Sequence, residues 1–322
     1  MGRLTAFVLT LAFGAFAALW NAHAENFPSR PIRVIVGFPP GSAADITARL
    51  VGDSMSRTLG QQLVIETHPG AGSSIAAELV VRAPADGYTL FIGTSSNVTN
   101  AFISSNLRFD FGKDLAPVTT LTLLPLILAV PPSLGVSNVD ELIALAKSKP
   151  GELTYASVGP GTTPHLSTEL FAMRANIRLV HVPYPGSPPA VTDLLAGRVS
   201  MMLGVASTII PHLETGRLKA LAVTSLKRAQ IAPAVPTMAE AGLPEFDAGV
   251  WFGLMAPAGT PHDMIEKLAA VANAALKDEH IIAKLRAQAF EPLGGTPEEF
   301  AGLIARDSRK WSAVAKAAGL TN

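Results

Sequence analysis

The chain has 322 residues, in which 25 lysines and arginines balance 25 aspartates and glutamates, so no cationic excess is available for general binding to nucleic acid or to a membrane surface. It has no cysteine, which excludes disulfides, thiolate metal sites and cysteine nucleophiles. With 48% hydrophobic and 16% charged residues, the composition is that of a folded protein of about two domains rather than a disordered chain.

The first 24 residues have the pattern of a secretory signal peptide. Arg3 precedes an uncharged and largely apolar stretch, 4–20, and Ala22-His23-Ala24 is a small-x-small cleavage motif. The alternative is a membrane anchor, since this stretch is close to the lower length limit of a spanning helix. The cleavage motif favours a signal peptide, so we expect an exported protein that begins at Glu25.

The first part of the mature chain alternates apolar, β-branched runs with segments of helical period, which predicts a parallel sheet covered by helices. We expect strands at 32–38, 63–67 and 88–93, and helices at 43–59 and 73–82. A capping residue, Ser42, precedes the first helix, and Gly60 follows it.

A long apolar stretch of β character, 118–130, leads into a second series of the same kind. In this series the expected helices are 139–147, 164–175, 188–196 and 209–214, and the expected strands are 153–158, 179–183, 199–205 and 218–224. Another strand-like run, 250–256, would return the chain to the first series. Helices at 263–277, 281–289 and 298–318 are expected to pack there. The pattern therefore predicts an α/β protein with two crossover strands, one lobe formed by 25–122 and 249–322 and the other by 123–248, and a cleft between them.

Turns that join a strand to a helix recur in both expected lobes and combine glycine with a hydroxyl group. They are Pro40-Gly41-Ser42, Gly70-Ala71-Gly72-Ser73-Ser74, Gly161-Thr162-Thr163-Pro164 and Gly186-Ser187-Pro188. The start of a helix has unpaired N–H groups and the positive end of the dipole, which together attract a carboxylate or phosphate. For Ser42 and Asp45 the alternative is a helix cap and nothing more. Because none of these turns contains lysine or arginine, they predict reversible binding of an anion through neutral donors.

Other candidate residues allow two interpretations each. His165 either contacts a ligand or is packed in the first turn of its helix. Tyr184 is expected to lie in the cleft, and the alternative is a hydroxyl tied to the backbone. The stretch Thr94-Ser95-Ser96-Asn97 is either a polar binding loop or a helix cap.

Signals of an enzyme are weak. No nucleophile elbow, P-loop or zinc helix is present, and the histidines lack the spacing of metal ligands. We therefore expect no enzymatic activity, no metal and no cofactor. An exported hydrolase with Ser, His and Asp from distant loops is left as a minor alternative.

Six segments in order along the chain resemble one known family. They are Val36-Gly37-Phe38-Pro39-Pro40-Gly41-Ser42-Ala43-Ala44-Asp45, Pro69-Gly70-Ala71-Gly72, Pro84-Ala85-Asp86-Gly87-Tyr88-Thr89-Leu90, Tyr155-Ala156-Ser157, His181-Val182-Pro183-Tyr184-Pro185-Gly186 and Val235-Pro236-Thr237-Met238-Ala239-Glu240-Ala241-Gly242. Together they resemble the tripartite tricarboxylate transporter receptors, also called Bug or TctC-like proteins. The resemblance implies a periplasmic-binding-protein fold of type II that closes on a small, usually carboxylated solute. It also implies delivery of that solute to a membrane permease with a large and a small integral subunit, by a periplasmic receptor expected to be monomeric.

The resemblance further implies which residues bind the ligand, mainly through backbone groups, hydroxyls and water. Carried over to this sequence, they are Pro40, Gly41, Ser42, Asp45, Gly70, Ala71 and Ser95 in the first lobe and Ser157, Thr162, His165, Tyr184 and Gly186 in the second. In this set Asp45 is expected to organise its turn rather than to touch an anion. The chain departs from the commonest pattern at Ser73, where glycine is frequent, and at Pro185, where a cation is frequent. The second departure makes a less charged or more apolar acid, or an amide, a conceivable ligand. A sensor for a membrane signalling kinase is an alternative with the same ligand chemistry.

Overall fold

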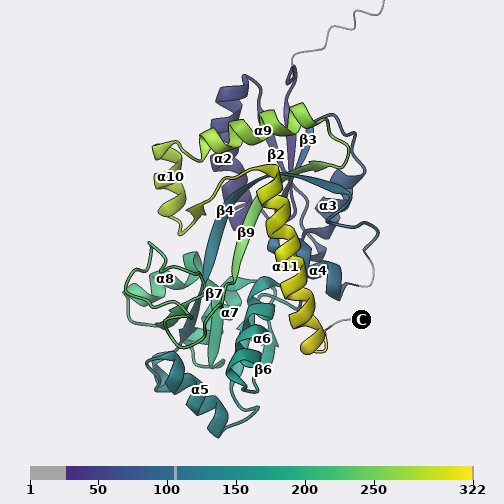
Figure 1. Cartoon of the computed structure of the whole chain (residues 1–322). Coiled ribbons are helices and arrows are strands. Elements are labelled where there is room, and N and C mark those ends of the chain that lie inside the picture. The colour runs from purple at the N-terminus through teal and green to yellow at the C-terminus, as the bar shows by residue number, and fades with distance from the viewer. Residues whose placement is uncertain (1–26, 105–106, 321–322) are drawn as a thin grey trace, which may run out of the picture.

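The computed structural model describes residues 27–104 and 107–320, and the predicted signal peptide therefore lies outside the described residues. Two α/β lobes are joined by long strands, as the sequence predicts (Figure 1). No helix within the described ranges is long and apolar enough to cross a membrane.

The first lobe has a parallel sheet in the order β2-β1-β3. Its strands are β1 (Ile32–Val36), β2 (Leu63–Thr67) and β3 (Thr89–Thr94), and its first helices are α2 (Ala43–Leu59), α3 (Ser74–Val81) and α4 (Ser95–Ile103). The bounds of α2 are those predicted, because the Ser42 hydroxyl accepts a hydrogen bond from the Asp45 amide and Gly60 ends the helix at φ 67°. Helix α4 begins where the sequence left a helix cap as one of two alternatives.

Two antiparallel strands connect the lobes. Strand β4 (Leu115–Val130) pairs with β9 (Gly249–Pro257) from Leu115 to Pro125, and β9 also pairs with β3. The remainder of β4 pairs with β7 and β8 of the second lobe. Both crossover strands are thus built into the sheet of the first lobe, and β4 also runs through that of the second.

The second lobe repeats the architecture of the first. Its strands are β5 (Thr154–Ser157), β6 (Val180–Pro183), β7 (Met201–Val205) and β8 (Lys219–Val223), and its helices are α5 (Val139–Ser148), α6 (Thr163–Ala175), α7 (Ser187–Leu195) and α8 (Ala206–Glu214). Strand β5 lies between β6 and β7 and is parallel to both. The carboxyl ends of these parallel strands lead into the turns that the sequence singled out.

The C-terminal segment forms α9 (His262–Ala275), α10 (Glu279–Arg286), the two-residue strand β10 (Glu291–Pro292) and α11 (Pro297–Ala317). Helices α9 and α10 pack against α2 of the first lobe, as predicted. Helix α11 lies along both lobes instead (Figure 1). Its 21 residues extend about 31 Å at the usual rise per residue, so one apolar face can cover both. Phe300 packs in a cluster with β1 and β3, whereas Trp311 packs in the core of the second lobe.

Candidate functional site

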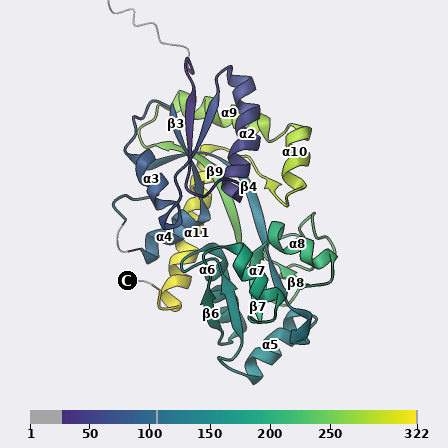
Figure 2. The ribbon, with the colours of Figure 1, turned by 180° about the vertical axis from the view of Figure 1, so that it is seen from behind.

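The predicted site residues lie in, or directly beside, the strand-to-helix turns before α2, α3 and α4 of the first lobe and before α6 and α7 of the second (Figure 2). Each turn follows a parallel strand, at the edge of the sheet where ligands bind in proteins of this class.

The first turn, before α2, is organised by a buried carboxylate. Asp45 is 3% exposed, and its Oδ2 accepts hydrogen bonds from the Gly41 amide at 2.9 Å and from Arg49 Nε at 3.0 Å. Burial alone would raise the pKa of Asp45, but the hydrogen bonds from Arg49 and Gly41 outweigh it, and the pKa lies below its ordinary value. Asp45 therefore fixes the turn, while Pro40 and Gly41 are exposed on it.

The second turn, before α3, has an unusual backbone. Ala71 and Ser73 adopt positive φ angles of 45° and 77°, and Asn100 of α4 donates a hydrogen bond to the Gly72 carbonyl at 3.0 Å. The buried Ser73 packs directly against Gly37, which follows β1, and a side chain at Gly37 would displace it. The Ser73 hydroxyl has no hydrogen-bond partner among the described residues. The turn is thus held from both sides, by α4 and by the end of β1.

The third turn begins α4, where Thr94-Ser95-Ser96-Asn97 form a helix cap, one of the two interpretations that the sequence left open. The Thr94 amide donates to Asn97 Oδ1 at 2.9 Å, in a capping box where asparagine replaces the usual glutamate or glutamine. Asn97 is 2% exposed, and its Nδ2 has no partner within the described chain. A buried donor of this kind needs a water or a ligand.

The two lobes meet where α4 faces the turn before α6. Ser95 Oγ lies 2.8 Å from Thr163 Oγ1, and Thr99 Oγ1 donates to the Gly161 carbonyl at 2.6 Å. All four residues are buried. Ser95, a predicted site residue of the first lobe, is therefore joined by a neutral hydrogen bond to the second lobe at Thr163. The neighbouring predicted residue, Thr162, donates from Oγ1 back to the Gly159 carbonyl at 2.7 Å.

A pair of imidazoles supports this second-lobe turn. His165 is 2% exposed, and its Nδ1 accepts a hydrogen bond from the Gly161 amide at 3.0 Å. His181 lies parallel to it with ring centroids 4.0 Å apart, and its Nε2 is 2.6 Å from Ser157 Oγ. The structure thus places His165 in packed surroundings and in contact with the turn.

The last turn, before α7, begins at Tyr184. Its hydroxyl donates to Asp193 Oδ2 at 2.7 Å, so it is tied to a carboxylate rather than to the backbone. Partial burial and the hydrogen bond to Asp193 raise the pKa of Tyr184 to about 12. Across residues 27–104 and 107–320, no hydrogen bond joins the Tyr184–Gly186 turn to the Pro40–Ser42 turn.

Three polar residues of this region, namely Thr99, Asn100 and His181, were not identified as candidates from the sequence. Asn97 and Thr163 lay in stretches that the sequence singled out, but they were not among the residues expected to bind the ligand. His181 could have been found from the register of two predicted strands, since it lies beside Tyr155 in the parallel β5–β6 pair. Thr99 and Asn100 lie on α4, for which the sequence offered a helix cap only as one alternative. No group of acidic or histidine side chains in the described ranges could hold a metal ion.

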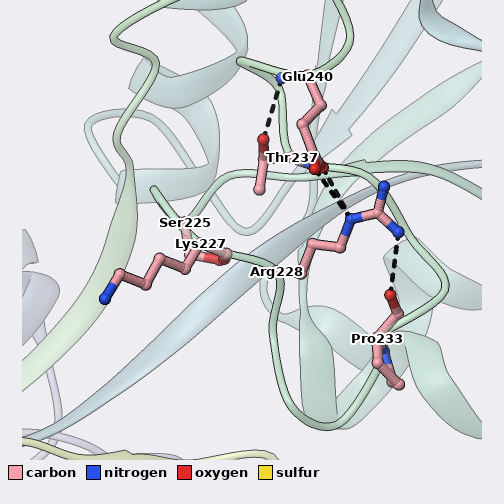
Figure 3. Close-up of polar contacts among 6 residues, drawn as sticks. All are labelled: Ser225, Lys227, Arg228, Pro233, Thr237 and Glu240. Atoms are coloured by element: carbon pink, nitrogen blue, oxygen red, sulfur yellow. Dashed lines mark hydrogen bonds and ion pairs between the residues drawn. The ribbon is translucent and has the colours of Figure 1, made fainter.

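A separate groove of about 640 Å³ lies beside the crossover strands and contains none of the predicted site residues. It is lined by Leu123, 225–228, Gln230, Ile231, Asp247, Arg286 and 289–293. One wall is a firmly held loop, in which Arg228 binds Glu240 at 2.9 Å and the Pro233 carbonyl at 3.2 Å (Figure 3). Lys227 points away from these partners (Figure 3).

Comparison with known proteins identifies a family. The model of the family described as tripartite tricarboxylate transporter family receptor matches residues 47–320. Protein BugT of Bordetella pertussis is 37% identical over 322 residues, which are 99% of this chain and 98% of that protein. The solved structure of R. palustris Rpa4515 with adipate is 36% identical, with a TM-score of 0.82 and coverage of 92% of this chain and 99% of that one. MatC (Rpa3494) from Rhodopseudomonas palustris with bound malate is 32% identical, with a TM-score of 0.77 and coverage of 89% and 99%.

Proposed function

The chain belongs to the tripartite tricarboxylate transporter receptor family, and from this premise we propose that it is a periplasmic receptor that captures a small carboxylate between its two lobes. The observation that carries the proposal is the set of uncharged donors where α4 faces α6, together with the buried Asn97 Nδ2, which has no partner among the described residues. The relatives solved with adipate and with malate indicate the class of ligand.

The proposed binding residues come from the turns described above. They are Pro40, Gly41, Ser42, Gly70, Ala71 and Ser95 from one lobe, with Asp45 as organiser, and Thr162, Tyr184 and Gly186 from the other, with the buried Ser157 and His165 acting through the turn that they hold. Within the described chain we assign 27–122 and 249–320 to the first lobe and 123–248 to the second, with α11 packing on both. Neutral donors suit reversible capture, for which a micromolar receptor needs only about −8 kcal/mol.

We further propose that the solute is handed to a membrane transporter with a large and a small integral subunit. The receptor would reach the periplasm as a monomer after cleavage behind Ala24. A catalytic role is not part of the proposal, because Ser157 is fully buried and already hydrogen-bonded to the Gly159 backbone and near His181. Such a hydroxyl is not accessible to a substrate as a nucleophile.

Calorimetric titration of the purified protein with adipate, malate and citrate tests the proposal, with adipamide as the uncharged control. We expect micromolar binding of at least one acid and none of the diamide. Replacing Asn97 with Leu should weaken binding about tenfold or more, since about 1.4 kcal/mol corresponds to a factor of ten. A folded protein that binds none of the three acids, or that binds the diamide equally well, would contradict the proposal.

A further inference from the structure

Two stacked imidazoles lie beneath the turn that joins the second lobe to the first. His165 holds the Gly161 amide directly, and His181 holds the Ser157 hydroxyl, which in turn accepts a hydrogen bond from the Gly159 amide at 3.1 Å. The same short turn presents the Gly161 carbonyl to Thr99. Both rings therefore support one segment whose other side meets α4.

We propose that His165 is a positioning residue for ligand capture, which holds the turn 159–163 against the first lobe only while its Nδ1 is unprotonated, so that acid loosens the receptor's grip. This inference rests on the proposed function, since it concerns how the same site is held. It assigns the pair of histidines a regulatory role that is separate from contact with the ligand.

The geometry requires one protonation state. Nδ1 of His165 accepts the Gly161 N–H, so the single proton of the neutral ring must be on Nε2. Protonation of Nδ1 would set two N–H groups against each other and remove this hydrogen bond. It would also place a positive charge in a stack whose ring centroids are 4.0 Å apart.

Among the described residues, His165 has no carboxylate partner that could compensate for a positive charge. Burial, and to a smaller extent His181, lower the pKa of His165 to about 4. The other titratable groups nearby are Tyr155, whose ring is stacked on both imidazoles, and Glu169, whose carboxylate is already hydrogen-bonded by the Tyr155 hydroxyl. From the first lobe, α4 contributes the neutral hydroxyls of Ser95 and Thr99 to the contact.

The direction of the pH effect follows from these contacts. A histidine freed from them would titrate near its ordinary value of about 6.5. The held turn favours neutral His165, so it is fully stabilised above about pH 6.5 and loses stability as the pH falls from there toward 4. One coupled proton can change the affinity by at most about tenfold per pH unit.

A substitution that keeps the acceptor but cannot titrate provides the test. In His165→Asn the amide oxygen can replace Nδ1 as the acceptor for Gly161, whereas His165→Leu removes the acceptor. Between pH 7 and pH 5, adipate affinity of the unaltered protein should fall more than that of His165→Asn, by up to about tenfold per pH unit. The ligand's own titration is the same for both proteins and cancels in this comparison. His165→Leu should bind weakly at both pH values.

A measurement without ligand separates this inference from the proposed function. At pH 7, nitrogen NMR of the imidazoles should show that the single ring proton of His165 is on Nε2. Hydrogen exchange at the amides of Gly159, Gly161, Thr162 and Thr163, corrected for the intrinsic pH dependence, should quicken between pH 7 and pH 4.5 in the unaltered protein and not in His165→Asn. A proton on Nδ1 at pH 7, or equal quickening in both proteins, would overturn the inference whether or not adipate binds.

Discussion

Ser95 and Thr163 face each other across the two lobes, with their hydroxyl oxygens 2.8 Å apart and both side chains buried. Each begins a helix, α4 in one lobe and α6 in the other. The contact therefore joins the two helix starts that are proposed to hold the ligand, and it can be tested without knowing that ligand.

The stability lost on removing each of these two hydroxyls separately should add up to more than the stability lost on removing both together. Ser95→Ala or Thr163→Val leaves the other buried hydroxyl without this partner, which costs about 1 to 3 kcal/mol. The double variant should lose less than the sum of the two, with a coupling of about 0.5 to 1.5 kcal/mol. Urea unfolding of the unaltered protein, the two single variants and the double variant measures this coupling. Additive effects would show that the contact contributes nothing.

The carboxylate of Asp45 gives a prediction with a defined pH dependence. The hydrogen bonds from Arg49 and Gly41 hold its pKa below 3.8, so the ionised group stabilises the fold above that value, and this contribution is lost as the pH falls through the lowered pKa. We expect Asp45→Asn to lower the free energy of unfolding by about 1 to 3 kcal/mol at pH 7. The difference from the unaltered protein should shrink toward pH 2.

Denaturant titrations at pH 7, 4 and 2.5 would check this dependence. Asp53→Asn is a control on the same helix, because Asp53 is exposed and has no hydrogen bond to the turn. If the two variants lost the same stability, or if the loss at Asp45 were unchanged at pH 2.5, the organising role of its charge would be wrong.

The parts of the fold that local signals specify were predictable. Helix α2 has a capping serine before it and a glycine in the left-handed region after it, and both signals lie next to the helix. For α4 the sequence left a helix cap and a binding loop as alternatives, because its nine residues show no clear apolar period and its cap uses Asn97 rather than glutamate or glutamine.

The contacts that depend on tertiary packing were not predictable. The sequence placed His165 at a helix start and His181 in a strand, but the stacking of their rings depends on how α6 packs over β5 and β6. In the same way, the apolar face of α11 was evident, but not that Trp311 would pack in the second lobe. Periodicity shows which face is buried and does not show what covers it.

The crossover strand β9 is anchored to α11 by a buried hydrogen bond. Trp251 Nε1 donates to Asp307 Oδ2 at 2.7 Å, and Lys310 pairs with the other oxygen of the same carboxylate at 2.8 Å. Asp307→Ala should therefore destabilise the protein by about 1 to 3 kcal/mol, because the buried indole N–H loses its acceptor. Asp307→Asn keeps an acceptor oxygen and should lose less.

Both variants at Asp307 can be followed by thermal unfolding and by the tryptophan emission maximum. We expect a shift to longer wavelength in Asp307→Ala, where water can reach the indole. If both variants were as stable as the unaltered protein, with the same tryptophan emission maximum, this hydrogen bond would not be what anchors β9.

Gly37 should tolerate no side chain, because β1 ends directly against the turn before α3. A Cβ atom at Gly37 would lie 1.9 Å from Ser73 Oγ and 2.6 Å from Ser73 Cα, so the backbone itself would have to move. Gly37→Ala should destabilise the protein by more than about 2 kcal/mol, in the range found for overpacked interiors, and should weaken ligand binding by displacing the Gly70–Ala71 segment. Gly52→Ala is the matched control, since its Cβ would meet nothing closer than 3.5 Å. In the interior of a helix such as α2, alanine is more favourable than glycine by up to about 1 kcal/mol. Chemical unfolding of the two variants, together with calorimetry using the acid that binds most tightly, tests this prediction. If the two variants were equally stable, the turn could shift away at no cost. The close packing of β1 against the turn would then not be what positions this part of the site.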